Sequence, residues 1–153
     1  HAYNQLLEDT SIQEMEKLWR VHVQNPMHLL AKVSRKLRAN ETSYVLFIGS
    51  IWGTAGAAGE VVYSAVKGAQ HAFVKAYAQE VAYNGIRVNA IAPGFIDTEM
   101  NNHLSAEDKL ALCDEIPYGR MGTADEAAKM VCSIINSPDY LTGQIITMDG
   151  AWC

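Results

Sequence analysis

Two short apolar runs, with one long helical pattern between them, limit the folds that this chain can adopt. Residues 44–49 are rich in β-branched and other apolar side chains on both faces, which is typical of a strand buried in a parallel sheet. Residues 86–91 predict the next buried strand. Between them, residues 61–84 predict a helix that Gly85 closes. A strand, a helix and a second strand in this order form a right-handed crossover, so we expect an α/β fold with a parallel sheet and helices on both faces.

A helical region precedes the first strand. A capping-box pattern formed by Ser11 and Glu14 predicts that a helix begins near Ser11. Pro26 lacks an amide proton and clashes with the preceding turn, so it must either kink this helix or open a second one. Residues 27–38 then predict an amphipathic helix. We expect its inward-facing side chains to be Leu29, Leu30, Val33 and Leu37.

One more helix and one more strand are expected after the second apolar run. Pro93 and Gly94 end that run, and a polar loop follows. A capping-box pattern that begins at Thr123 predicts a further helix, and residues 144–148 predict the last strand. At 153 residues and 49% hydrophobic, the chain suits one domain with a sizeable core.

Charge and hydropathy argue against two kinds of partner. The net charge is −5 and the twelve Lys and Arg form no long run, so we expect no nucleic-acid surface. No apolar stretch approaches the roughly 18 residues that a membrane-spanning helix needs, so we expect no membrane partner. One local basic cluster is interpreted as a solvated helix end, and its members are Lys32, Arg35, Lys36 and Arg38.

Cysteine and histidine usage bears on location and on metals. The three cysteines form no C-x-x-C pair, which favours a reduced, cytoplasmic setting. The histidines, at positions 1, 22, 28, 71 and 103, show no zinc-type spacing with each other or with the cysteines. We therefore expect no metal site.

Three side chains with complementary chemistry surround the first crossover. Ser50 places a hydroxyl at the end of the first strand, and Tyr63 and Lys67 lie one turn apart on one face of the following helix. A phenol beside an ammonium group can act as an acid or base in catalysis. The same Tyr–Lys spacing is common in ordinary helices, so its context decides the interpretation.

The context here is the sheet edge at which ligands bind. Ser50 ends the first strand, and Pro93 and Gly94 end the second. Parallel α/β sheets bind their ligands at the carboxyl ends of the strands, so both strand ends face one crevice. This convergence favours a catalytic constellation formed by Ser50, Tyr63 and Lys67.

With these motifs identified, the sequence resembles the C-terminal part of a short-chain dehydrogenase/reductase, over nearly its whole length. The matching segments follow the family's order and are residues 48–50, 63–67, 85–94, 96–100, 119–120, 142–143 and 149–150. Within the family it is similar to the 3-oxoacyl-acyl-carrier-protein reductases and to the related elongation factor P 5-aminopentanone reductases. The resemblance implies the C-terminal part of a Rossmann-like, doubly wound parallel sheet.

The resemblance also implies an activity and a missing part. Residues 1–153 correspond to one partial domain, the catalytic half, and lack the N-terminal dinucleotide-binding half with its Gly-rich turn. We expect an oxidoreductase that transfers hydride between a nicotinamide cofactor and a ketone or secondary alcohol. NADP is the expected cofactor, and NAD stays open. The expected substrate is a small or carrier-protein-bound ketone, and a homotetramer or homodimer is expected.

The family's residue roles carry over to this chain position by position. Tyr63 would exchange the proton, Ser50 would hold the substrate oxygen, and Lys67 would lower the pKa of the phenol and hold the nicotinamide ribose. Further cofactor contacts are implied for Pro93, Gly94, Ile96 and Thr98, and a lid over the substrate for residues 100–113.

One family position differs in this chain. The family places an Asn on the helix before the first strand, where it holds a water in the proton relay, and the register puts His22 at that position. An imidazole can hold a water and relay protons, so His22 is a fourth catalytic candidate. An ordinary surface or capping histidine is the alternative, and Gln24 or Asn25 would take the position if the register slips.

A non-catalytic function is the competing hypothesis. A truncated subunit without a phosphate-binding turn would be catalytically idle and would act as an oligomerisation or interaction module. Small side chains on the predicted helix permit close helix packing, and they are Ala65, Gly68, Ala69, Ala72 and Ala76.

Overall fold

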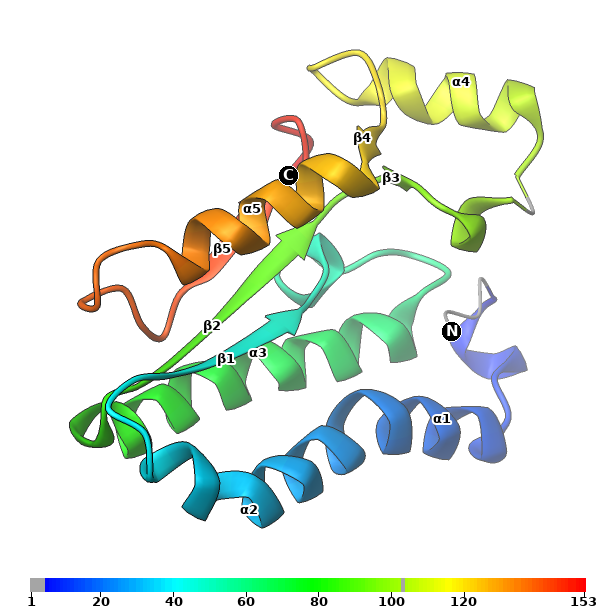
Figure 1. Cartoon of the computed structure of the whole chain (residues 1–153). Helices are drawn as coiled ribbons and strands as arrows, with labels where there is room; N and C mark the ends of the chain where they lie inside the picture. The colour runs from blue at the N-terminus through cyan, green and yellow to red at the C-terminus, as the bar shows by residue number, and fades with distance from the viewer. Residues whose placement is uncertain (1–4, 103) are drawn as a thin grey trace.

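A three-stranded parallel sheet forms the centre of the computed structural model, which describes residues 5–102 and 104–153. Its strands lie in the order β1 (Ser43–Ile48), β2 (Ile86–Pro93) and β5 (Ile145–Met148). Helix α3 (Val61–Val81) runs from the end of β1 back to the start of β2 (Figure 1). Phe47 pairs with Ala90 in the register of the two strands. The predicted strand–helix–strand crossover is therefore confirmed.

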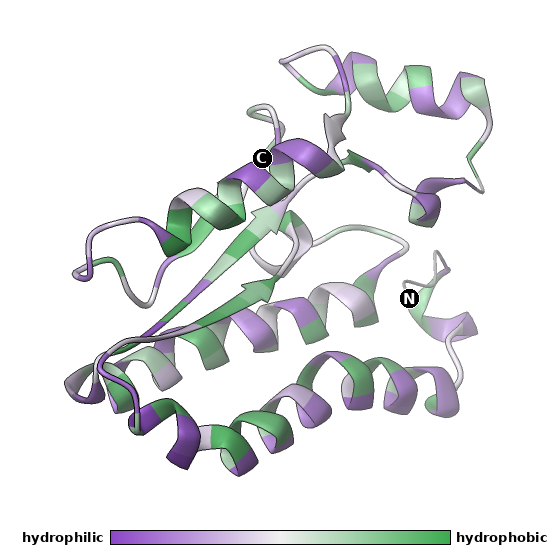
Figure 2. Ribbon diagram, in the orientation of Figure 1, coloured by the Kyte–Doolittle hydropathy of each residue, from purple (hydrophilic) through white to green (hydrophobic). Residues whose placement is uncertain are grey.

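Helices cover both faces of this sheet (Figure 1). Helix α3 packs on one face of β2, and α5 (Ala124–Ile135) lies across the other face. β1 and β2 are hydrophobic over much of their length (Figure 2). β2 is buried from Ile86 to Ala92, because it is the central strand and has a helix on each side. The α/β class with helices on both faces is thus confirmed.

The region before β1 is one helical rod with an irregular turn in its middle. α1 (Ile12–Trp19) begins with the predicted capping box of Ser11 and Glu14. A π-helical turn (Arg20–Gln24) follows and leads directly into α2 (Asn25–Arg38), whose first turn contains Pro26. Proline therefore distorts the rod without ending it, because its missing amide falls where the hydrogen-bond pattern already changes.

One side chain of α2 does not face the core as predicted. Leu30, Val33 and Leu37 pack into the main core cluster, but Leu29 is 60% exposed. Successive helical residues are about 100° apart, so Leu29 lies to the side of the face that Leu30 and Val33 define. The expectation of an inward Leu29 was wrong.

β1 is more open than its sequence suggests. Tyr44 is 40% exposed and Ile48 is 54% exposed, although both were expected to be buried. Within the described residues β1 pairs only with β2, so it is an edge strand, and α5 packs mainly on β2. Phe47 points to the opposite face and is buried against α2 and α3 in the core.

Shorter elements complete the fold and bring the C-terminal segments over the carboxyl ends of the strands. They are the short strands β3 (Ile96–Asp97) and β4 (Gly122–Thr123), the helix α4 (Ala106–Glu115), and the 3₁₀ turns Leu7–Asp9, Ile51–Gly53, Ala82–Asn84 and Glu99–Asn101. α4 stands away from the sheet at the top of Figure 1. Within residues 5–102 and 104–153, no helix combines the length and apolar character needed to cross a membrane.

Candidate active site

A pocket of about 420 Å³ opens at the carboxyl ends of β1 and β2, the edge predicted to bind ligand. It is built from the π-helical turn, the two strand ends, the start of α3, the loop after β2 and one face of α5. Seven of the eight predicted site residues line it, namely His22, Ser50, Tyr63, Lys67, Pro93, Ile96 and Thr98. The structure thus brings together side chains from segments up to 76 positions apart in the sequence.

Ser50 is held rigidly at the end of β1. Its backbone is extended, and its Oγ accepts a hydrogen bond of 3.2 Å from the amide of Trp52. The side chain is 8% exposed and hydrogen-bonds the phenol of Tyr63. A serine hydroxyl in contact with a phenol is well placed to hold one oxygen atom of a ligand between them.

Tyr63 and Lys67 lie one turn apart on α3, as their spacing predicts. The Lys67 Nζ atom is 5.5 Å from the centroid of the Tyr63 ring and donates a 2.9 Å hydrogen bond to the carbonyl of Ile48. Both residues are buried, at 9% and 5% exposure. The carbonyl at the end of β1 therefore fixes the ammonium group beside the phenol.

The pKa of Tyr63 does not move in the direction predicted from sequence. Burial raises the pKa of the phenol, the charge of Glu60 raises it further, and the hydrogen bond from Ser50 opposes both. Burial also lowers the pKa of Lys67 to about 8. Desolvation disfavours the charged form of each group, and Lys67 is not among the causes of the shift at Tyr63. That Lys67 lowers the pKa of Tyr63 therefore stays a prediction for the complete protein.

His22 reaches the site from the π-helical turn. Its ring meets the Tyr63 ring edge-on, with 5.7 Å between centroids. Burial, and then the charge of Lys67, lower the pKa of His22 to about 4, so the imidazole is neutral near pH 7. Gln24 and Asn25, the alternatives in the register, do not line the pocket. A neutral imidazole has one donor and one acceptor nitrogen, which are the groups that a water needs.

The end of β2 and the segment that follows it supply three of the predicted cofactor contacts to the pocket wall. Pro93, Ile96 and Thr98 line it, but Gly94 does not. A Cβ atom on Gly94 would lie 2.7 Å from the Cβ of Asp149, so this glycine makes room for the turn after β5. Glycine at position 94 therefore has a packing reason, and the cofactor contact implied for it stays a prediction.

Sequence reasoning missed one wall of the pocket. Small apolar side chains at i, i+3, i+4 and i+7 of α5 form it, and they are Ala124, Ala127, Ala128 and Val131. Met100 and Asn101, from the turn after β3, also line the pocket. The spacing of the α5 residues signals an apolar helix face, but only the folded chain shows that this face borders the pocket.

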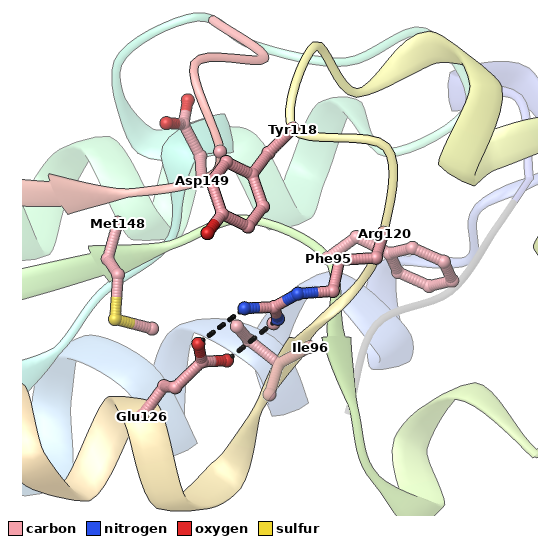
Figure 3. Close-up of a pocket in the computed structure, with 9 residues that line it drawn as sticks. Phe95, Ile96, Tyr118, Arg120, Glu126, Met148 and Asp149 are labelled. Carbon is pink, nitrogen blue, oxygen red and sulfur yellow. Dashed lines mark hydrogen bonds and ion pairs between the residues drawn. The ribbon is translucent and has the colours of Figure 1, made fainter.

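A second, smaller pocket of about 200 Å³ lies between the loop after β2, the turn after β5 and the start of α5 (Figure 3). Arg120 and Glu126 form a paired ion bridge across it, with N···O distances of 2.9 and 2.6 Å. Glu126 also closes the predicted capping box with Thr123, and these hydrogen bonds lower its pKa to about 2. Arg120 and Glu126 thus bind each other and anchor the start of α5.

The described part of the chain holds no group of three histidine, cysteine or acidic side chains arranged to bind a metal ion. Cys113, Cys132 and Cys153 are free thiols. His1 and His103, which showed no zinc-type spacing in the sequence, lie outside the described residues.

The parallel α/β sheet has a serine at the end of β1 and a tyrosine and a lysine on the following helix, and all three line one pocket, as the resemblance to the short-chain dehydrogenase/reductases implies. The family model described as Enoyl-(Acyl carrier protein) reductase matches residues 2–152. The chain therefore belongs to the short-chain dehydrogenase/reductase family, as the motifs predicted.

Curated relatives agree with this assignment and are longer than the chain. It is 40% identical to the "Uncharacterized oxidoreductase YmfI" of Bacillus subtilis over 95% of its own length and 60% of that protein. It is 38% identical to the 3-oxoacyl-[acyl-carrier-protein] reductase FabG of Pseudomonas aeruginosa, over 82% of the chain and 52% of that protein. The chain thus spans about half to three fifths of the length of these relatives.

Solved structures share the fold. The structure titled "ElxO with NADP Bound" superposes with a TM-score of 0.89 at 24% identity, covering 98% of the chain and 62% of that protein. A 4-hydroxyisoleucine dehydrogenase mutant complexed with NADH and succinate gives a TM-score of 0.93 at 21% identity, covering 99% and 64%. At these identities the likeness establishes the architecture alone.

Proposed function

We propose that the complete protein is an NADP-dependent carbonyl reductase that transfers hydride between the nicotinamide and a ketone or secondary alcohol. The observation that carries this proposal is the common pocket of Ser50, Tyr63 and Lys67, in which Ser50 hydrogen-bonds the phenol and Lys67 lies beside its ring. Family membership supports an oxidoreductase activity.

In this proposal each side chain has one task. Ser50 donates a hydrogen bond to the substrate oxygen and fixes it beside the phenol. Tyr63, whose raised pKa keeps it protonated near neutral pH, donates its proton to that oxygen during reduction. The cofactor, when bound, supplies the hydride. Neutral His22 holds a water in the path by which the phenol regains its proton.

The residues present suit a nicotinamide nucleotide. The pocket wall is largely apolar, with Ile91, Pro93 and Ile96 on one side, which fits a flat aromatic ring. The ammonium group of Lys67 would hold the ribose hydroxyls, and the Ile96 amide and Thr98 hydroxyl would hold the carboxamide. NADP in one solved relative's title favours NADP, and NADH in another keeps NAD open.

We also propose that the dinucleotide-binding half lies in a further segment of the complete protein. Its strands would extend the sheet beyond the edge strand β1. The free edge of β1 and the exposed side chain of Ile48 support an additional strand there. The greater length of the curated relatives supports the same arrangement. On this view, residues 1–153 are the catalytic half of one domain.

Substrate, assembly and location are proposed from the names of relatives, from exposed apolar side chains and from the cysteines. The names of the 3-oxoacyl-[acyl-carrier-protein] reductases support a ketone substrate that is either bound to a carrier protein or a small molecule. Exposed apolar side chains on the helical rod support a homodimer or homotetramer, and they are Ile12, Trp19, Val21 and Leu29. Free cysteines without a C-x-x-C pair support a cytoplasmic location.

The test is turnover by the full-length protein. NADPH oxidation should be measured by absorbance with a 3-oxoacyl thioester and with a simple aliphatic ketone, and repeated with NADH. We expect NADPH consumption that depends on the ketone. The absence of any ketone-dependent oxidation of either nucleotide by folded protein would refute the reductase proposal and leave the interaction-module hypothesis.

A further inference from the structure

Gln70 is a buried polar side chain to which the proposed reaction assigns no task. It lies on α3, seven residues after Tyr63 and therefore two turns along the same face, and it is 6% exposed. Its Nε2 donates a hydrogen bond to the main-chain carbonyl of His22. Its Oε1 is buried without a hydrogen-bond partner. A buried amide with one unsatisfied atom is unfavourable for stability, so the bond that its Nε2 donates to His22 needs an explanation.

The neighbouring proline explains why a side chain is needed at this carbonyl. In a regular α-helix the amide of residue 26 would donate to the carbonyl of residue 22, but Pro26 has no N–H. The π-helical turn displaces the pattern further, because the Asn25 amide bonds to the carbonyl of Arg20, five residues earlier. Pro26 and Gln70 line the same apolar groove between α2 and β1. Gln70 thus supplies from α3 the donor that Pro26 cannot supply.

This hydrogen bond links the two elements that carry the proposed proton path. His22 lies on the π-helical turn, while Tyr63 and Lys67 lie on α3. The His22 carbonyl held by Gln70 belongs to the residue whose ring meets the Tyr63 ring at 5.7 Å. We infer that Gln70 is a positioning residue that fixes His22 against the catalytic face of α3. The inference rests on the proposed reductase function for its effect on turnover, but not for its effect on His22.

Two substitutions and one matched control test this inference in the full-length protein. Gln70→Leu removes the donor and keeps most of the volume, and Gln70→Glu keeps the shape but carries no N–H. Gln79→Leu places the same change at an exposed position of the same helix and serves as the control. The readouts are kcat and KM, and the His22 titration followed by NMR of the imidazole.

We expect both Gln70 variants to lower kcat about tenfold or more while KM changes little, because a misplaced relay group slows turnover more than it weakens binding. The pKa of His22 should rise from about 4 toward its ordinary value as the ring leaves its buried place, and Gln79→Leu should change neither readout. Folded Gln70 variants with an unchanged His22 titration would overturn the inference. If the unaltered protein shows no reductase activity, the reductase proposal fails and the titration alone decides the role of Gln70.

Discussion

The phenol of Tyr63 has the most direct test at the scale of single residues. Its hydroxyl hydrogen-bonds Ser50 and faces the pocket, so Tyr63→Phe removes the proton donor and leaves the ring packing in place. General acid catalysis contributes roughly 10²–10⁴ in rate, so we expect at least about a 100-fold loss of kcat. NADPH affinity, measured by fluorescence titration, should hardly change. Retention of more than about a tenth of the original turnover would exclude Tyr63 as the donor.

Lys67 should make cofactor binding depend on pH in a measurable range. Burial lowers its pKa to about 8, so the side chain loses its charge as the pH rises through that value. If the ammonium group holds the ribose hydroxyls, NADPH affinity should weaken above about pH 8, and the loss should be absent in Lys67→Ala. Binding titrations from pH 6.5 to 9.5 check this. A pH dependence that survives in Lys67→Ala would assign it to another group.

At the scale of elements, a histidine of α3 sets the path of the loop that carries Ser50. The ring of His71 is 5% exposed, its Nδ1 contacts Thr54 Oγ1 at 3.2 Å, and it packs against two glycines that flank Ser50. A Cβ on Gly49 would lie 2.6 Å from His71 Nε2, and a Cβ on Gly53 would lie 2.6 Å from His71 Cε1. A side chain at either position would clash with the His71 ring, so both positions require glycine. The loop is therefore more closely packed than its glycine content suggests.

Gly49→Ala should consequently destabilise the protein by about 1–3 kcal/mol, the range of overpacking in a filled core. In a His71→Ala background the same change should be better tolerated, because the nearest conflicting atoms are gone. Chemical denaturation of the single and double variants measures this coupling. Equal effects in the two backgrounds would show that His71 does not confine the loop.

Elements were predictable from the sequence where local chemistry determines them. The capping boxes at Ser11 and Thr123 and the left-handed Gly85 after α3 all occur as expected, because each depends on residues only a few positions apart. The exposed Leu29 and Ile48 could not be predicted, because exposure depends on which element covers a face. The same limit applies to the α5 wall of the pocket.

The sequence predicts which residues line the candidate site, but it does not predict their pKa shifts. The strand ends and helix spacing correctly brought Ser50, Tyr63 and Lys67 together, because sheet topology alone places them at one edge. The direction of the pKa shift at Tyr63 depends on how deeply the folded chain buries it, and a sequence does not show burial depth. Gln70 was likewise missed, since its partner is a main-chain carbonyl 48 positions away.

For the molecule as a whole, the half-buried His22 and the buried His71 should make stability fall in mild acid. Burial and nearby lysine charge lower the pKa of His22 to about 4, and burial, Lys67 and Lys75 lower the pKa of His71. The unfolded chain protonates both rings near their ordinary pKa of about 6.5, while in the folded protein both pKa values lie lower, that of His22 at about 4. The unfolded state therefore binds more protons below pH 6.5, and the free energy of unfolding decreases as the pH falls.

The carboxylates whose pKa values are lowered, including Glu126, add to this loss only below about pH 4.5, so the window from 6.5 to 4.5 isolates the histidines. Each histidine can contribute a slope of up to about 1.4 kcal/mol per pH unit. Urea denaturation across this window should show a steeper pH dependence in the unaltered protein than in His22→Asn. The surface variant His28→Asn, at an exposed position of α2, is the control and should leave the slope unchanged. Equal slopes in the unaltered protein and His22→Asn would mean that the folded chain does not keep His22 neutral, and the proposed relay would lose its electrostatic basis.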